Sequence, residues 1–206
     1  LVSSLPESIK NLSMSISSSV TNMQLSKFAS NFFEMYGRLK NKSFYYKDVL
    51  NLLSDRFLRK SNEKLIESFE KIKSDIVRKN MVYVNSSYIT ELINDKKINK
   101  LFNSTELNIL DVLNDCICVF ELKIKENSFL EQSSKIKSTL QIIKNFNTKH
   151  EFKISFSSLK DFFLDIVKNQ SISFYGDPTN NIHIMGLLES RGLDFDNVII
   201  CSANEG

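Results

Sequence analysis

The sequence predicts a mainly α-helical protein with a smaller α/β part, in which a helical bundle is inserted between strands of a partial parallel sheet. Glycine and proline are absent from Arg38 to Tyr175, and apolar residues recur at helical spacing there. After about Ser171 the helical pattern gives way to short runs rich in Ile and Val. We therefore expect an inserted helical domain at 23–170, flanked by pieces of one α/β domain at 1–22 and 171–206.

Amphipathic patterns in the middle region predict six or seven helices. The segments are 25–39, 44–58, 61–79, 86–92, 104–126, 129–146 and 155–169. Ser61 or Asn62 is the expected N-cap of the third helix, and Ser86 or Ser87 that of the fourth. Ser104 is the expected cap of the fifth, which is apolar nearly all round and should be the buried central helix of the bundle.

Short runs at both ends predict strands. Alternation at 11–16 and 171–176, and apolar runs at 182–188 and 197–202, are typical of strands, with a turn at 176–181. The last two should be buried parallel strands. The sequence begins without methionine and stops within its last motif, so we expect a fragment of a longer protein.

Composition narrows the function classes. Twenty-seven basic and 24 acidic residues give a net charge of +3, which is not the strongly basic surface of a dedicated nucleic-acid-binding domain. No apolar run approaches the roughly 20 residues that cross a membrane. Three cysteines in a chain of this length are not a disulfide framework, so we expect a cytoplasmic protein.

No catalytic residue and no metal ligand is predicted. The phosphate-binding loop G-x-x-x-x-G-K-S/T is absent, so the chain alone should not hydrolyse ATP. His150 and His183 are isolated, and His183 is interpreted as a strand residue with a hydrogen-bond partner. Cys116 and Cys118 would point to different faces of a helix, so we interpret them as buried apolar residues.

Two surface features have alternative interpretations. Lysines on helix faces are interleaved with acids and serines, which favours a solvated surface over contact with a phosphate backbone. They are Lys64, Lys71, Lys73, Lys135, Lys137 and Lys144. The aromatic clusters "NFFEMY" (31–36) and "SFYYKD" (43–48) could stack bases, but 16 phenylalanines without a tryptophan favour packing in the helical core.

One stretch carries a family resemblance. "IHIMGLLESRGLDFDNVIICSANEG" (182–206) resembles the motif V segment of UvrD-like superfamily 1 helicases, whose usual form is an apolar strand, T-x-H-x-A/S-K-G-L-E-F/Y, a second apolar strand and a closing E-G. The stretch 190–195 matches the second half of the motif, with Arg191 for lysine and Asp194 for glutamate. Gly186 and Leu188 replace the threonine and histidine that help active helicases to hold single-stranded DNA.

The altered motif looks like that of AddB-like helicase-nuclease subunits, among them PD-(D/E)XK nuclease family proteins. "LPESIKNLSMSI" and "FYYKDVLNLLSDRFL" are also similar to that family. The resemblance implies a UvrD-like fold, with the helical domain inserted in a partial RecA-like (P-loop NTPase-type) sheet domain. It implies nucleotide contact by Arg191, Gly192 and Asp194, and DNA contact around Gly186, Leu188 and Glu189.

The resemblance also implies what the parent protein does. It would process DNA ends in double-strand break repair and recombination, as an exonuclease or helicase-like hydrolase working with a partner helicase-nuclease subunit. Its ligand would be double-stranded DNA ends or a single strand, and ATP and Mg²⁺ would bind outside this fragment. The fragment would supply DNA contact and interdomain structure. The alternatives are a helical module that docks the partner subunit without DNA contact, and an autonomous helicase.

Overall fold

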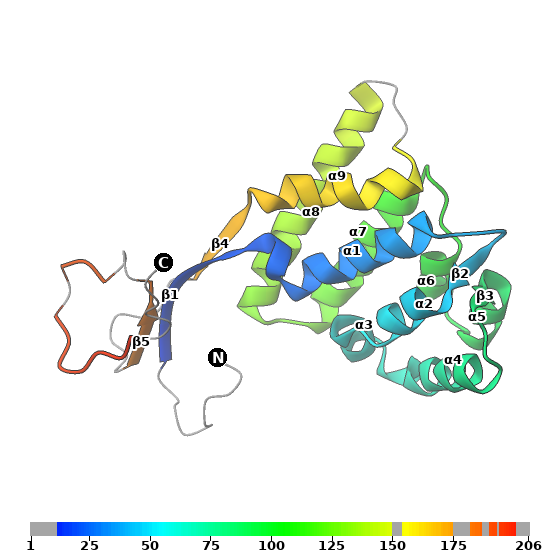
Figure 1. Cartoon of the computed structure of the whole chain (residues 1–206), viewed down its shortest axis with the longest axis horizontal. Helices are drawn as coiled ribbons and strands as arrows, with labels where there is room; N and C mark the ends of the chain where they lie inside the picture. The colour runs from blue at the N-terminus through cyan, green and yellow to red at the C-terminus, as the bar shows by residue number, and fades with distance from the viewer. Residues whose placement is uncertain (1–11, 150–153, 175–181, 187–189, 193, 201–206) are drawn as a thin grey trace. The chain divides into compact units, whose positions relative to one another are not determined.

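The structure is a computed structural model that describes residues 12–149, 154–174, 182–186, 190–192 and 194–200 (Figure 1). The chain divides into two compact units. One is Ser19–Ile172, and the other combines Leu1–Ser18 with Ser173–Gly206. The first unit is largely helical, which confirms the prediction of a mainly α protein. The sequence predicts the boundaries of the helical domain near residues 22 and 171.

Nine α-helices lie in the described part of the Ser19–Ile172 unit. They are α1 (Gln24–Gly37), α2 (Tyr46–Leu53), α3 (Arg56–Ser61), α4 (Ile66–Arg78), α5 (Ser86–Leu92), α6 (Lys96–Asn99), α7 (Ile109–Lys123), α8 (Asn127–Lys149) and α9 (Phe156–Lys168). Short 3₁₀ turns are η2 (Val20–Asn22), η3 (Glu63–Leu65) and η4 (Lys100–Phe102). The number exceeds the six or seven predicted because one segment divides and the four-residue α6 carries no amphipathic signal.

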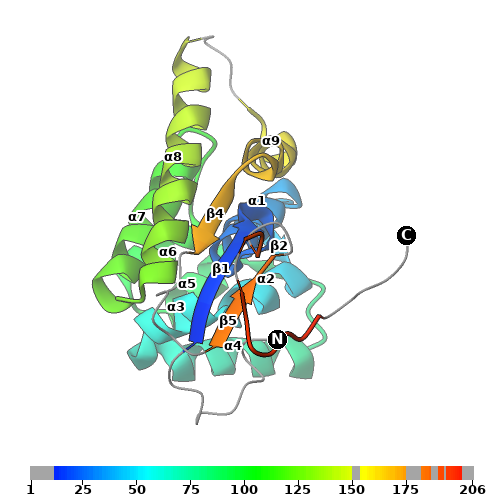
Figure 2. The ribbon, with the colours of Figure 1, turned by 90° about the vertical axis from the view of Figure 1, so that its left-hand side faces the viewer.

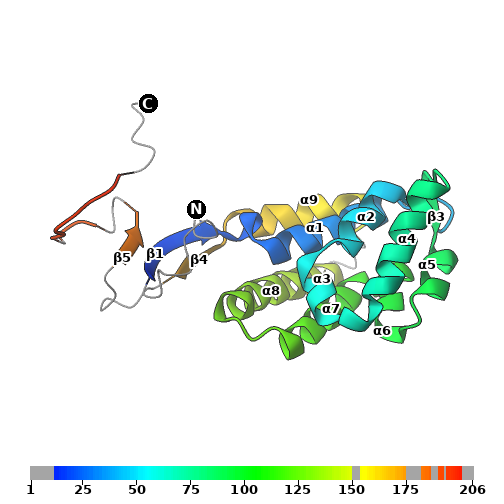
Figure 3. The ribbon, with the colours of Figure 1, turned by 90° about the horizontal axis from the view of Figure 1, so that it is seen from below.

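Helix α1 lies at the centre of the helical unit. It contacts α2, α8 and α9, and Figure 3 shows α1 beside α9 and α7 beside α8. Phe33 packs edge-on against Phe163 of α9, with ring centroids 5.4 Å apart, and Phe28 packs on Phe120 of α7 at 5.3 Å. A Cβ on Gly37 would lie 3.3 Å from the Phe156 carbonyl oxygen, so glycine permits the close approach of α9 to the end of α1.

The prediction of one continuous helix at 44–58 is wrong. Residues Ser43–Tyr45 form strand β2, α2 follows, and Asp55 breaks the helix by capping α3. The Asp55 carboxylate accepts hydrogen bonds from the backbone N–H groups of Phe57 at 2.8 Å and Leu58 at 3.1 Å. Aspartate favours this capping geometry over a helix interior.

The expected N-caps are also corrected. Helix α4 begins at Ile66 after the η3 turn, so neither Ser61 nor Asn62 caps it. Asn85 caps α5, because its side-chain oxygen accepts from the Ser87 N–H at 2.9 Å. Helix α7 begins at Ile109, beyond Ser104.

Helix α7 is buried on one side and is not the fully buried central helix that was expected. Leu113, Ile117 and Phe120 are fully buried, whereas Leu122 is 69% exposed. Apolar residues on all sides of α7 therefore did not indicate a fully buried helix. The regular apolar stripe of α1 marks the centre of the core instead.

A two-stranded antiparallel sheet in the helical unit was not predicted. Strand β2 (Ser43–Tyr45) pairs with β3 (Tyr83–Asn85). Lys40 and Ser43 exchange backbone hydrogen bonds across a two-residue loop, Asn41–Lys42, whose φ angles of 47° and 59° are those of a type I′ turn. Positive φ is uncommon for lysine, so pairing of the flanking residues holds this loop.

Strands β1 (Leu12–Ser19), β4 (Ser171–Phe174) and β5 (Ile182–Met185) form a sheet in the order β4-β1-β5 (Figure 2), and β1 and β4 extend across the boundary between the two units. Strands β1 and β5 are parallel, with Leu12 opposite Ile182. These elements confirm the strands expected at 11–16, 171–176 and 182–188 within the described residues. Strand β5 is not the buried strand that was expected, because Ile182 is 44% exposed and the rest of the strand is half-buried.

The strand expected at 197–202 is not present over its described part, 197–200. Val198, Ile199 and Ile200 are 66%, 90% and 67% exposed. A strand requires a neighbouring strand to take its backbone hydrogen bonds, and none of the described strands runs beside these residues. Residues 201 and 202 lie outside the described part.

Candidate nucleotide and nucleic-acid interface

The motif V-like segment begins directly after β5. The Ser190 N–H donates to the carbonyl oxygen of Gly186 at 3.2 Å, which closes a turn after the strand. Gly192 follows with a φ of 75°, and a Cβ placed on it would meet no atom within 4 Å. The backbone conformation, and not crowding, therefore favours glycine at this position.

The candidate nucleotide-binding side chains are open to solvent. Arg191, Gly192 and Asp194 are all exposed. Arg191 and Asp194 form no ion pair with each other, although both belong to the described residues. The segment therefore exposes one cation and one carboxylate that are close in sequence. The guanidinium can donate to phosphate oxygens, and the carboxylate can accept from a hydroxyl.

The candidate DNA-contacting positions are only partly described. Gly186 is half-buried at the end of β5, and it offers backbone groups alone. Leu188 and Glu189 lie outside the described residues. His183 is half-buried in β5, and its ring lies 6.2 Å from that of Phe195 in the exposed segment. That contact was not evident from the sequence, because it depends on the turn that returns the chain towards the strand.

Three of the six lysines on the helix faces pair with acids. Lys73 contacts Glu70 at 3.3 Å, Lys137 contacts Glu121 at 3.1 Å, and Lys144 contacts Asp111 at 2.7 Å. Exposed pairs of this kind contribute little to stability, about 0–1 kcal/mol each. They do neutralise the lysines locally, which agrees with a solvated surface.

The two aromatic clusters differ in burial. Phe32, Phe33 and Tyr36 of the "NFFEMY" cluster are buried, as expected for a core. In the "SFYYKD" cluster Phe44 is buried, but Tyr45 and Tyr46 are half-buried at the surface. The core interpretation is therefore correct for the first cluster and wrong for the two tyrosines of the second.

Both cysteines of α7 were expected to be buried, which is correct for Cys116 and wrong for Cys118. Cys116 is buried, and burial raises the pKa of its thiol well above the ordinary range. Cys118 is half-buried, and both are free thiols. Among the described residues no group of three His, Cys, Asp or Glu side chains could hold a metal ion.

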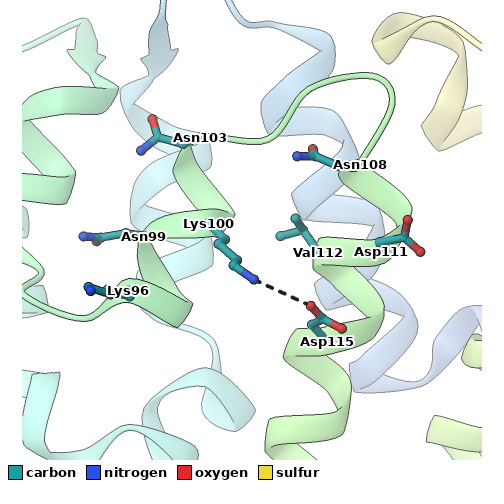
Figure 4. A pocket seen from close by; sticks show the side chains of 8 residues that line it. All are labelled: Lys96, Asn99, Lys100, Asn103, Asn108, Asp111, Val112 and Asp115. Carbon is teal, nitrogen blue, oxygen red and sulfur yellow. Dashed lines mark ion pairs between the residues drawn. The ribbon is translucent and has the colours of Figure 1, made fainter.

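A polar pocket of about 390 Å³ opens between the α6–η4 segment and α7 (Figure 4). It is lined by Lys96, Asn99, Lys100, Asn103, Asn108, Asp111, Val112 and Asp115. Lys100 and Asp115 point towards each other from the two walls, with Nζ and Oδ2 3.9 Å apart. Because both charge signs line it, the pocket selects neither an anion nor a cation.

These elements define a largely helical unit joined to a partial parallel sheet that carries an exposed glycine turn. The profile of the UvrD-like helicase C-terminal domain matches residues 4–206. The chain belongs to this family, and its role is that of a helicase-family domain. No curated protein and no solved structure matches the chain. No helix in the described part of the chain is long and apolar enough to cross a membrane.

Proposed function

We propose that the chain works as part of an AddB-like helicase-nuclease subunit that processes DNA ends in double-strand break repair and recombination. The observation that carries the proposal is the family match over 4–206 together with the altered motif at 182–206. In this proposal the sheet unit is part of a RecA-like domain, and the helical unit is inserted into it between β1 and β4. Both would contribute DNA contact and interdomain structure.

The exposed turn after β5 would face a nucleotide. Asp194 would accept a hydrogen bond from a ribose hydroxyl, and Arg191 would contact phosphate. Gly192 would keep the turn tight through its positive φ. These residues fit one side of a nucleotide site. The chain contains no phosphate-binding loop, so ATP and Mg²⁺ would be held mainly by other parts of the parent protein.

DNA contact at the motif would be weaker than in the usual form. Gly186 lacks the hydroxyl of the threonine that it replaces, and Leu188 lacks the imidazole of the histidine. With Glu189 nearby in sequence, the segment has no cation for a phosphate before Arg191. The proposal therefore assigns it to DNA positioning, with strand translocation and any nuclease activity belonging to the parent and its partner subunit in the cytoplasm.

The proposal is tested by gel-shift measurements on the 206-residue chain with single-stranded and duplex DNA across a range of salt concentrations. Backbone contacts release counterions, so affinity should fall steeply as salt rises. Absence of binding to either DNA at low salt would refute DNA contact and favour a module that docks a partner subunit. The chain alone should not turn over ATP, so helicase activity must be measured on the parent protein.

A further inference from the structure

We propose that the outer face of the β2–β3 sheet, with the residues around it, is a stacking surface for single-stranded nucleic acid. We name it the tyrosine surface and define it by Tyr45, Tyr46 and Tyr83. The inference deepens the proposed DNA contact and rests on it. It assigns a ligand class and a site that the motif at 182–206 does not contain.

Successive side chains of a strand point to opposite faces of the sheet, and this alternation places the aromatic rings on the outer face. Phe44 and Val84 are opposite each other in the register and are both 1% exposed, so they form the inner face. Tyr45 and Tyr83 are the next opposed pair and point to the other face. Their ring centroids lie 6.0 Å apart, and Tyr46 lies 5.0 Å from Tyr45.

The rings remain accessible at the surface of the unit. Tyr83 is 42% exposed, and Tyr45 and Tyr46 are half-buried. Three adjacent aromatic rings at a surface are costly to leave in water, and a base has a π-face that stacks on such rings without regard to sequence. The surface is therefore suited to several consecutive unpaired bases.

Cations surround these rings. Lys40 Nζ lies 5.7 Å from the ring centroid of Tyr83, and Lys47 Nζ lies 6.0 Å from that of Tyr46. Lys42 occupies the tip of the type I′ turn beside Lys40. All three lysines are exposed, and none forms an ion pair with a carboxylate of the described residues. Their ammonium groups can therefore contact a phosphate backbone.

The acids closest to the tyrosine surface are already engaged. Arg38 lies 5.9 Å from the Tyr45 ring and binds Glu34 and Asp48, with Asp48 Oδ1 at 3.0 Å. Asp48 is buried, so it does not repel a phosphate at the surface. Asp75 accepts from the hydroxyl of Tyr88 and pairs with Arg78 and Lys79. The accessible charge around the rings is therefore positive.

This combination distinguishes a nucleic acid from other anionic partners. An acidic peptide would use the lysines but not the rings, whereas a duplex would present phosphates but no free base faces. Only a single strand uses the rings and the lysines together. The polar pocket beside α7 lacks both features, since its walls carry opposite charges.

The test measures binding of the full chain to a labelled deoxythymidine oligonucleotide of about 12 nucleotides, within the usual site size. A matched abasic oligonucleotide, a uridine oligonucleotide and poly-glutamate are the comparison ligands. The chain has no tryptophan, so quenching of its tyrosine fluorescence reports stacking directly. We expect quenching by the two base-bearing oligonucleotides and none by the abasic strand or poly-glutamate.

The variants separate the two contributions. Tyr45→Ala with Tyr83→Ala should weaken deoxythymidine binding at least about 30-fold, since each ring lost costs about 5- to 150-fold, and should leave abasic binding unchanged. Tyr45→Phe with Tyr83→Phe keeps both rings and should bind like the wild type. This second pair also controls for folding, which is checked by circular dichroism.

The lysines are tested by their salt dependence. Replacing Lys40, Lys42 and Lys47 by glutamine should reduce the slope of log affinity against log salt by about 2, at roughly 0.7 per phosphate contact on a single strand. The matched control replaces three exposed lysines on other elements, Lys27, Lys123 and Lys168, and should leave the slope unchanged.

The outcomes separate this inference from the proposed function. If the chain binds single-stranded DNA and both alanine changes leave that affinity unaltered, the tyrosine surface is wrong while DNA contact stands. If no DNA binds at low salt, DNA contact fails and the tyrosine surface fails with it. Equal binding of abasic strand, poly-glutamate and deoxythymidine strand would overturn stacking and identify a general anion surface.

Discussion

Tyr36→Phe is the substitution whose cost is set most directly by the structure. Tyr36 is 2% exposed, and its hydroxyl donates to the Leu101 carbonyl oxygen at 3.0 Å and accepts from the Ser104 N–H at 2.7 Å. Burial raises the pKa of this hydroxyl, so it stays protonated at neutral pH. The two bonds attach the segment between η4 and α7 to the central helix.

Phenylalanine keeps the ring in place but leaves two buried backbone groups without their partner. Each such group costs about 1–3 kcal/mol, so the free energy of unfolding should fall by roughly 2–6 kcal/mol. For a unit of this size, the midpoint of thermal unfolding should fall by about 4–24 °C.

The assay is urea and thermal unfolding followed by far-ultraviolet circular dichroism. Tyr83→Phe is the matched control, because Tyr83 is 42% exposed and its change should stay within about 0.5 kcal/mol. A Tyr36→Phe protein as stable as the Tyr83→Phe protein would show that the hydroxyl does not fix the η4–α7 segment.

Three further substitutions test the helical unit by unfolding measurements. Phe33→Ala removes a fully buried ring at the α1–α9 contact and should cost about 3–5 kcal/mol; a cost below 1 kcal/mol would contradict the packing. Asp55→Ala should lose about 1 kcal/mol by removing the α3 cap, while Asp55→Asn keeps the acceptor; equal stability of the two would contradict the cap. Lys160→Met should cost about 0.5–1 kcal/mol at pH 7, because Lys160 donates to Glu34 at 2.6 Å and lowers the pKa of that carboxyl. A lowered carboxyl pKa stabilises the fold above the ordinary value of 4.5, so this difference should shrink as the pH falls below that value; a difference that grows in acid would refute the pairing.

Periodicity predicted the long helices well, because each depends on a local stripe of apolar residues. Helix α1 follows directly from the spacing of its phenylalanines, and its bounds lie within two residues of the expected segment 25–39. The β2–β3 sheet escaped prediction because Tyr45 pairs with Tyr83, and no local pattern links residues so far apart in sequence. The same pairing places Phe44 and Tyr45 in a strand, so the helix that was expected to begin at 44 begins at Tyr46.

The candidate site was also predicted only where a local sequence pattern exists. Gly192 was singled out by the motif alone, and the structure gives it a positive φ. Tyr45 and Tyr46 of the tyrosine surface were assigned to the core, because 16 phenylalanines without a tryptophan favoured core packing of the aromatic clusters. A signal was present in the alternation of Phe44 with Tyr45 and in the lysines at 40 and 42. This signal can be interpreted only once the strand pairing shows which face of the sheet is buried.

Photocrosslinking tests the proposed DNA contact most directly, with single-stranded DNA that carries 5-iodo-deoxyuridine and the 206-residue chain. Iodouracil reacts preferentially with aromatic side chains that stack on it, and mass spectrometry then identifies the linked residue. We expect crosslinks at Tyr45 or Tyr83, lost when salt is raised enough to abolish binding. Crosslinks confined to other elements would contradict the tyrosine surface, and a chain that forms no crosslink under any salt condition would contradict its role in DNA contact.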